Sequence, residues 1–230
     1  MNEILKDSIL FGVSVSLLGY EAGRWMQKRY KKAIFNPLLI SVVLVISFLL
    51  LFHIDYETYN NGAKYIGFLL TPATVCLAIP LYEQLELLKN NVCAVALGIL
   101  SGVITSLTGV WILSRLFSFS HEEYVTLLPK SITTGIGIGI SEEMGGIPTI
   151  TVAVIVITGI LGNVLAESIC KLFRITEPVA KGLAIGTSAH AMGTSKAIEM
   201  GDIEGAMSSL AIASAGLVTV IFASIYANFI

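Results

Sequence analysis

Long apolar runs separated by short polar segments dominate the hydropathy pattern of the 230-residue chain. A transmembrane helix needs about 20 mostly apolar residues to cross a hydrocarbon core of about 30 Å. Runs of this kind, without the alternation of a membrane barrel, predict spanning helices. They are Pro37–Ile54, Val92–Phe117, Ile147–Cys170 and Ala206–Ile230, with a first helix expected in Met1–Gly23 and a proline-kinked one in Tyr65–Tyr82. The pattern therefore predicts an all-α, polytopic integral membrane protein.

A polar signature occurs twice within this apolar pattern. The segment Glu143-Met144-Gly145-Gly146-Ile147 returns 56 positions later as Glu199-Met200-Gly201-Asp202-Ile203. In each copy a stretch rich in Gly, Ser and Thr precedes this element, and a long apolar run follows it. Broken helices at corresponding positions of two repeats are typical of the substrate sites of secondary transporters. The duplication therefore indicates a transport core.

The distribution of basic residues sets the expected topology. The basic cluster Arg24–Lys32 follows the first helix and is expected in the cytoplasm, which puts the N-terminus outside. The basic loop Lys171–Lys181 reaches the same side only if Leu127–Gly145 dips into the membrane and returns instead of crossing it. Glycines and hydroxyl residues in that segment suit such a re-entrant hairpin, because they accommodate a broken backbone. A second hairpin, Gly182–Gly201, then dips from the cytoplasmic side.

The expected topology contains two copies of opposite orientation, each made of one broken hairpin and one spanning helix. Residues 127–172 and 183–230 form this inverted-topology repeat, and residues 127–230 together form the transport core. Residues 1–126 are expected to supply scaffold helices within a single membrane domain. The two hairpin tips are expected to meet near the midplane of the bilayer.

The composition agrees with a membrane protein and argues against several other classes. Hydrophobic residues make up 55% of the chain and charged residues 13%, with a mean hydropathy of +0.82 and a formal net charge of -2. No basic face indicates a nucleic-acid partner. The sequence contains no nucleophilic triad, metal-ligand cluster, Walker loop or Rossmann fingerprint. We therefore expect no enzymatic activity, no metal and no cofactor.

The first copy offers a cation, hydroxyl groups and an acidic pair. Lys130 follows Pro129, a residue that favours the first turn of a helix, where backbone N–H groups attract an anion. The alternative is that Lys130 extends to the membrane interface. Glu142 and Glu143 are candidates for a proton or sodium site, or one of them caps the next helix. The substrate-binding candidates of this copy are Lys130, Ser131, Thr133 and Thr134.

The second copy offers a histidine among small residues. His190 can bind a carboxylate when protonated and couple transport to protons, because its ordinary pKa lies near neutrality. The alternative is a structural histidine that is satisfied by a neighbouring carbonyl. Lys196 is a second cation, or it lies at the cytoplasmic edge, and Glu199 joins His190, Glu142 and Glu143 as an ion-coupling candidate. The substrate-binding candidates of this copy are Thr187, Ser188, His190, Gly193, Thr194, Ser195 and Lys196.

Four segments of the chain resemble the LrgB/CidB family. They are Pro129–Thr134, Ile140–Pro148, Lys181–Thr194 and Glu204–Leu210. Together with the chain length, the resemblance covers essentially all 230 residues. Gly135 departs from the family, in which proline more often follows the two threonines, and this difference bears on the stiffness of the first hairpin.

The resemblance implies two kinds of function. Bacterial members are named antiholin-like or holin-like proteins and are linked to murein hydrolase activity, autolysis and programmed cell death, beside a small LrgA/CidA-type membrane partner. Other members resemble carriers of small carboxylates, including pyruvate in bacteria and glycolate or glycerate in the chloroplast envelope. Because a holin has no use for paired polar hairpins, we expect a proton-coupled monocarboxylate transporter in the cell membrane, as a homodimer. The murein hydrolase regulator is the alternative.

Overall fold

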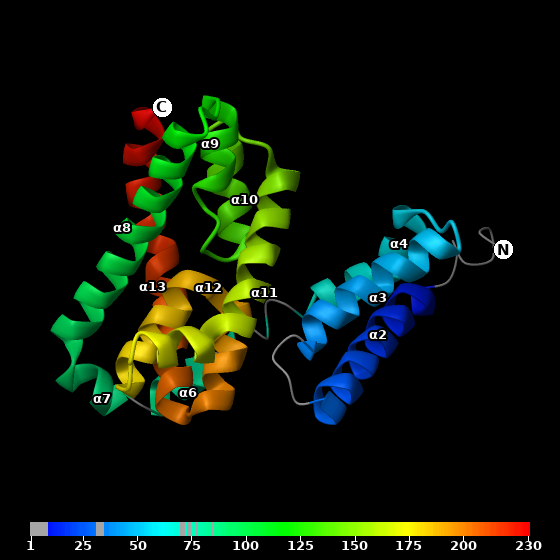
Figure 1. Cartoon of the computed structure of the whole chain (residues 1–230), viewed down its shortest axis with the longest axis horizontal. Coiled ribbons are helices and arrows are strands. Elements are labelled where there is room, and N and C mark those ends of the chain that lie inside the picture. The colour runs from blue at the N-terminus through cyan, green and yellow to red at the C-terminus, as the bar shows by residue number, and fades with distance from the viewer. Residues whose placement is uncertain (1–8, 31–34, 70–71, 73–74, 77, 84) are drawn as a thin grey trace. The chain divides into compact units, whose positions relative to one another are not determined.

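The computed structural model of the chain describes every residue except 1–8, 31–34, 70–71, 73–74, 77 and 84. The described residues form helices joined by short turns, and no strand occurs among them (Figure 1). They divide into two compact units, Met1–Cys76 and Leu77–Ile230. The all-α fold class predicted from the hydropathy pattern is confirmed.

The first unit packs two helices against a long first helix. The elements are α2 (Ile9–Tyr30), α3 (Pro37–Leu51) and α4 (Tyr56–Gly67). Gly12 of α2 lies against the backbone of α4, and Gly62 of α4 lies against the backbone of α2. Helix α2 continues past its predicted end at Gly23 and through much of the basic cluster. The reason is that Arg and Lys favour helix, and Arg24 pairs with Glu21 one turn earlier at 2.8 Å.

The region that was predicted as one helix, Tyr65–Tyr82, lies partly outside the described residues. Its described ends belong to α4 and to α6 (Ala78–Glu83), and α7 (Leu85–Asn90) follows. Helices α6 and α7 belong to the second unit, in which α6 packs against the last long helix.

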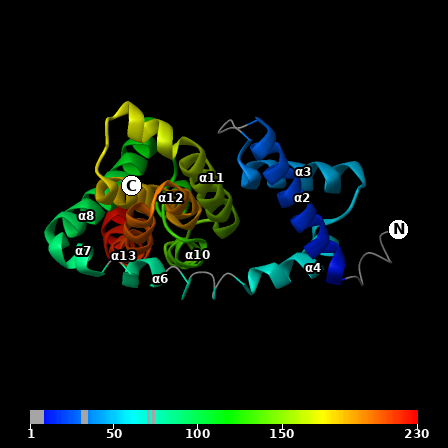
Figure 2. The ribbon, with the colours of Figure 1, turned by 90° about the horizontal axis from the view of Figure 1, so that it is seen from below.

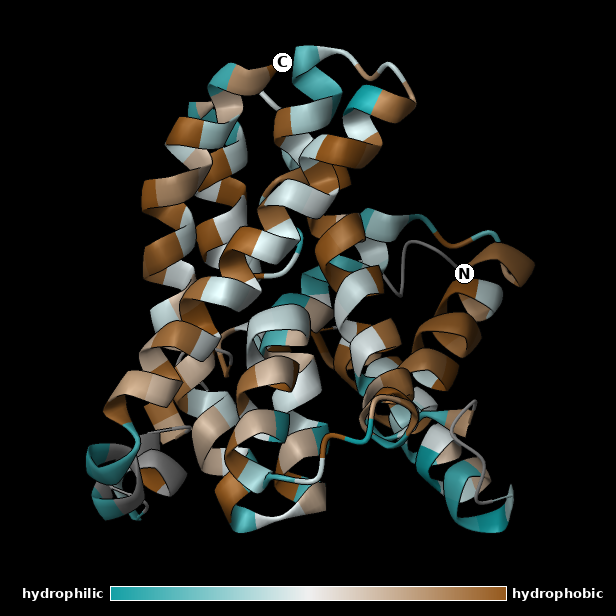
Figure 3. Cartoon of the chain, turned by 60° about the vertical axis from the view of Figure 1, so that its left-hand side comes forward, coloured by the Kyte–Doolittle hydropathy of each residue, from teal (hydrophilic) through white to brown (hydrophobic). Residues whose placement is uncertain are grey.

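Three helices of the second unit are long and apolar enough to cross a membrane, among the residues that the structure describes. They are α8 (Val92–Leu116), α11 (Pro148–Leu172) and α13 (Asp202–Tyr226), and the short helix η2 (Ala227–Phe229) follows α13. Each of the three has 25 residues, or about 37 Å at about 1.5 Å per residue, which exceeds a hydrocarbon core of about 30 Å. Large apolar side chains such as Leu97, Ile157 and Leu217 are more than half exposed on them, and the ribbon of Figure 3 shows many hydrophobic residues (brown) along the long helices. The chain is therefore a helical membrane protein.

A first helical hairpin precedes α11. Its arms are α9 (His121–Leu127) and α10 (Thr134–Glu143), joined by a turn over residues 128–133. At its base the Thr151 hydroxyl lies 2.9 Å from the carbonyl oxygen of Thr126 in one arm and 2.7 Å from Ser141 Oγ in the other. Near its tip Gly137 lies against Pro129. The two arms therefore run side by side, as a re-entrant hairpin requires.

The boundaries of this hairpin differ from the prediction in two ways. Its first arm begins at His121 rather than at Leu127, because Ser120 and Glu123 form a capping box that starts a helix inside the acidic loop. The half-helix does not begin at Lys130, since Pro129 and Lys130 lie in the turn and α10 begins after its N-cap Thr133. Lys130 thus occupies the tip of the hairpin.

A second helical hairpin is hidden within α12 (Pro178–Met200). The helix breaks at His190, which has φ 40° and ψ -140°. After the break the chain folds back, because Gly193 lies against Ile185 and Ala189, and Ile185 shares a buried cluster with Ala197. In a straight helix, residues 185 and 197 would be about 18 Å apart. This matches the broken hairpin predicted over Gly182–Gly201, with His190 at its tip.

The two hairpins enter the second unit from opposite ends. In Figure 1 the first extends from the end where α13 finishes, and the second extends from the end near α6 and α7. Figure 2 shows α12 between α11 and α13, both of which it contacts. The repeated Glu-Met-Gly element closes each hairpin, because α10 ends at Glu143 and α12 ends at Met200. The arrangement is that of an inverted repeat.

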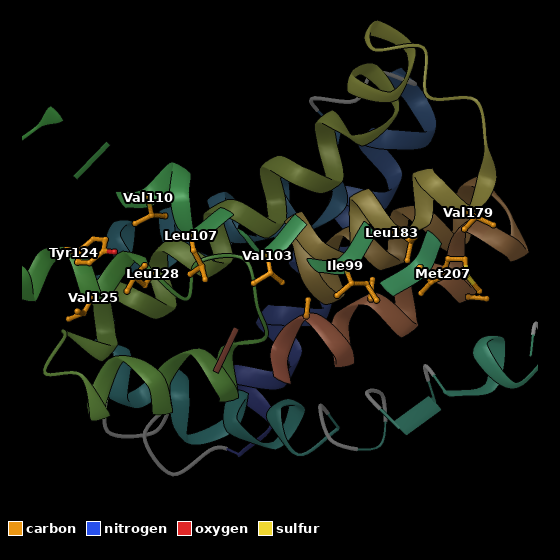
Figure 4. Close-up of a cluster of buried hydrophobic side chains, with 14 residues drawn as sticks. Ile99, Val103, Leu107, Val110, Tyr124, Val125, Leu128, Val179, Leu183 and Met207 are labelled. Carbon is orange, nitrogen blue, oxygen red and sulfur yellow. The ribbon is translucent and has the colours of Figure 1, made fainter. Parts of the chain in front are cut away.

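One face of α8 forms the core that joins both hairpins. Ile99, Val103 and Leu107 of this face are at most 4% exposed. They belong to a cluster with Leu128 at the first tip and Leu183 in the second hairpin (Figure 4). These contacts bury one face of α8 and leave a neighbouring face of the helix available to line a cavity.

Candidate functional site

A cavity of about 820 Å³ lies where α8, the tip of the first hairpin and the first arm of the second hairpin come together. Four of the substrate-binding candidates line it: Lys130, Ser131, Thr187 and Ser188. A smaller space of about 10 Å³ lies between Ser131 and Ile132 of the first tip and Thr187 of the second hairpin. The structure therefore brings residues of both hairpins to one site, as the repeat predicted.

Lys130 lines this cavity together with two hydrogen-bonded hydroxyl groups. Its Nζ donates to Ser131 Oγ at 3.0 Å, and the Ser106 hydroxyl of α8 donates to the same oxygen at 3.0 Å. Because Ser131 Oγ accepts both bonds, its own hydrogen remains available as a donor. No ion pair among the described residues includes Lys130. The group can therefore offer an anion a full positive charge together with a hydroxyl donor.

Thr187 and Ser188 line the cavity in a different role from the one expected. The Thr187 hydroxyl donates to the carbonyl of Leu183 at 2.8 Å, and the Ser188 hydroxyl donates to that of Ala184 at 2.7 Å. Since each hydroxyl carries one hydrogen, neither can donate to an anion without giving up this bond. Thr187 also packs against Gly102 of α8. These two residues shape the wall of the cavity.

The remaining hydroxyl and glycine candidates lie outside the cavity lining. Thr133 and Thr134 begin α10. The buried Thr194 shares a hydrogen bond of 2.7 Å with Ser208 of α13, and Gly193 lets the two arms of its hairpin meet. Ser195 accepts from the side chain of Asn163 at 2.9 Å. The candidates of the second arm thus hold the hairpin in place.

Of the charged candidates at the hairpin bases, the three acids are exposed and Lys196 is partly buried. Glu142 and Glu143 are exposed at the end of α10, and Glu143 contributes to a separate cavity of about 280 Å³ beside His121. Lys196 pairs with the exposed Glu199 one turn later at 3.2 Å. The structure does not bring any of these four residues to the cavity of Lys130.

His190 is buried at the break of the second hairpin and does not line the cavity. It is 4% exposed, and its Nε2 lies 3.0 Å from the carbonyl oxygen of Ile155 in α11. A carbonyl oxygen only accepts, so Nε2 carries the hydrogen. The ring reaches this carbonyl because Gly159, one turn along α11, has no side chain to block it. This is the carbonyl contact that the alternative interpretation of His190 expected.

The contribution of α8 to the site was not predicted from the sequence. Ser101, Thr105 and Ser106 line the cavity from a helix that was assigned to the scaffold. Together with Gly98, Gly102 and Gly109 they form a stripe of small and polar residues at spacings of three and four. Such spacing places residues on one helical face, so the stripe within an apolar run was the available signal. Among the described residues, no group of three or more His, Cys, Asp or Glu side chains could hold a metal ion.

Comparison with known proteins gives a consistent family match. A family model described as the LrgB-like family matches residues 16–229. The chain is 39% identical over 221 residues to proteins named antiholin-like protein LrgB, with 96% of each chain covered, in Bacillus mycoides (strain KBAB4) and Bacillus cereus (strain B4264). The protein of the same name in Bacillus anthracis (strain CDC 684 / NRRL 3495) is similar to the same extent. No solved structure shows significant similarity to the chain.

Proposed function

The chain belongs to the LrgB-like family, and from the geometry of its cavity we propose that it is a secondary transporter of small monocarboxylates. The substrates are of the pyruvate, lactate, glycolate or glycerate type, and transport is coupled to protons. The protein lies in the cell membrane with its N-terminus outside and acts as a homodimer.

The observation that carries this proposal is the position of Lys130. A lysine that is partly buried and has no carboxylate partner among the described residues is costly within a membrane protein. Such a residue is normally retained for function. The hydroxyl of Ser131 gives the bound carboxylate a second contact. One positive charge and few polar partners suit a monocarboxylate better than a dicarboxylate.

Alternating access follows from the opposed hairpins. The cavity is bounded by the tip of one hairpin and an arm of the other, so a rocking motion of one repeat changes the end from which the anion is reached. His190 is the proposed proton-coupling group. It is ionisable and buried at the point where the second hairpin breaks.

Uptake by purified protein in liposomes tests this function. Labelled pyruvate, lactate, glycolate and glycerate are supplied outside, with and without an inward proton gradient. Saturable uptake that exceeds that of protein-free liposomes and rises with the gradient is expected. Uptake equal to that of protein-free liposomes for all four acids would contradict the proposal.

A second candidate function follows from the name of the relatives. Proteins named antiholin-like are 39% identical to the chain, and this name favours a membrane regulator over a carrier. In that function the protein controls murein hydrolase activity, autolysis and programmed cell death together with an LrgA/CidA-type partner, without a substrate. A cell that lacks the protein would then show altered autolysis, and a transport-deficient variant would restore the normal rate. Failure of every such variant to restore it would favour the carrier.

A further inference from the structure

The cavity is far larger than the smallest carboxylates need. Its volume is about 820 Å³, within the range of about 300–1,000 Å³ that is typical of sites for drug-sized ligands. A three-carbon acid occupies roughly 100 Å³, the space of three or four water molecules at about 30 Å³ each. Most of the cavity would therefore remain empty of substrate if only such acids were bound.

The cavity is a groove along two parallel helices. Gly98 of α8 lies against Leu183 of α12, and Gly102 lies against Thr187, so the residue numbers rise together along both helices. The same register places Glu177, the N-cap of α12, beside the beginning of α8. Lys130 lies next to Ser106, about 14 residues or roughly 21 Å further along α8. The groove thus has its cation toward one end and an acid at the other.

The wall between these two ends is mainly apolar. Its apolar residues are Ala94, Val179, Ala180, Leu183 and Ala184, and Ser101, Thr105 and Thr187 line the same stretch. Ala94, Ala180 and Ala184 are exposed, so their methyl groups can be covered by a ligand. Burial of apolar surface stabilises a complex by about 0.8 kcal/mol per methylene. An alkyl tail that leaves Lys130 along this wall would gain affinity with each carbon.

The charges of the lining also restrict the ligand. Among the described residues that line the groove, Lys130 is the one cation and Glu177 the one acid. A second carboxylate directed along the groove would meet no positive charge and would lose water of hydration against the mainly apolar wall. A ligand with one carboxylate and an apolar tail meets a favourable partner at both of its ends.

We infer that the groove binds monocarboxylates with an apolar tail of several carbons, with the carboxylate at Lys130 and the tail directed along the wall toward Leu183 and Ala184. This inference rests on the proposed function and narrows its substrate class. It predicts that straight-chain acids from propionate to hexanoate bind better with increasing length. Succinate, which lacks the apolar tail, and hexan-1-ol, which lacks the charge, are expected to bind weakly.

Competition and binding measurements test the inference. Unlabelled acids compete with labelled pyruvate for uptake by the wild-type protein in phosphatidylcholine liposomes. Each added methylene is expected to lower the half-inhibitory concentration about two- to fourfold. The same acids are added to the detergent-purified protein while its thermal unfolding is followed, and hexanoate is expected to stabilise it more than acetate. The two measurements distinguish a failure of the proposed transport from a failure of the inference. Length-dependent stabilisation without pyruvate uptake would contradict transport alone. Pyruvate uptake without length dependence would overturn the inference.

A variant that fills the groove supplies the decisive comparison. Ala184→Phe places a ring on the apolar wall and leaves Lys130 intact, so hexanoate is expected to lose at least tenfold in potency while acetate changes little. Ala213→Phe adds the same ring to an exposed position of α13 outside the cavity lining and serves as the control. Equal hexanoate potency in Ala184→Phe and Ala213→Phe, or competition by hexan-1-ol as strong as that by hexanoate, would overturn the inference.

Discussion

The Nε2 atom of His190 lies 3.0 Å from the backbone carbonyl oxygen of Ile155. This contact joins the break of the second hairpin to the first third of α11, the spanning helix of the first repeat. The side chain of Ile155 is fully buried and lies against Gly137 of the first hairpin. One residue of α11 therefore contacts both hairpins.

The substitution His190→Gln tests the role of this histidine in coupling. Glutamine places an amide N–H donor close to the position of Nε2, but it does not titrate between pH 5 and 8. We expect the variant to exchange pyruvate at equal pH and to lose its acceleration by an inward proton gradient. Uptake in proteoliposomes with and without the gradient measures this. An acceleration equal to that of the wild type would assign His190 a purely structural role.

The substitution Gly159→Ala tests the packing of the His190 ring against Gly159. A Cβ at this position would lie 2.6 Å from His190 Cε1 and 2.8 Å from Met192 Sδ, so the hairpin tip must shift. We expect the free energy of unfolding to fall by about 1–3 kcal/mol in a detergent denaturation experiment. In the matched control, Gly139→Ala, the added Cβ meets nothing within 4 Å, and a helix interior gains up to about 1 kcal/mol from this change. Similar stability of the two variants would show that the ring is not held at Gly159.

The substitution Asn163→Leu tests how the second arm is held after the break. The Asn163 amide donates to the carbonyl of Met192 at 2.6 Å and to Ser195 Oγ at 2.9 Å. Leucine leaves these acceptors without that donor, which costs about 1–3 kcal/mol of unfolding free energy. The exposed Asn228, whose amide donates to the carbonyl of Ser224 four residues earlier, is the control, and Asn228→Leu should change stability by about 0.5 kcal/mol or less. An equally small effect of Asn163→Leu would exclude a role of this contact in holding the arm.

The substitution Ser106→Ala tests the part of α8 in substrate binding. The hydroxyl of Ser106 donates to Ser131 Oγ and so orients the group that stands beside Lys130. Loss of one neutral hydrogen bond of about 1 kcal/mol corresponds to an increase of about fivefold in the KM for pyruvate. Ser224→Ala, on the exposed face of α13, should leave the KM unchanged. A KM within twofold of the wild type for both variants would exclude a role of Ser106, and so of α8, in substrate binding.

The sequence predicted the arrangement of the hairpins better than their ends. Lys130 and His190 were identified because a lysine beside proline and a histidine among alanines are unusual within apolar surroundings. The sequence placed His190 within the second hairpin, but it placed Lys130 at the start of a half-helix, whereas the structure has it in the turn at the tip of the first hairpin. The first arm was missed because Glu122 and Glu123 marked it as an acidic loop, although the capping box of Ser120 starts a helix there.

Other features of the site had weak signals or none in the sequence. The partner of His190 is a backbone carbonyl, which every residue carries, so only the fold can select Ile155. The hydroxyl of Thr187 was expected to bind substrate, yet it bonds to the carbonyl four residues earlier, a choice that depends on the side-chain rotamer. Ser106 lay within an apolar run that was long enough to be read as a plain spanning helix.

Pyruvate uptake by Lys130→Ala in proteoliposomes shows whether this cavity binds the substrate. Because Lys130 supplies the positive charge at the cavity, its loss is expected to lower uptake at least tenfold, as expected for a charged hydrogen bond of about 1.5–3 kcal/mol. Lys171→Ala removes an exposed lysine at the end of α11 and should transport at the wild-type rate. Wild-type uptake by Lys130→Ala would contradict the assignment of this cavity as the substrate site.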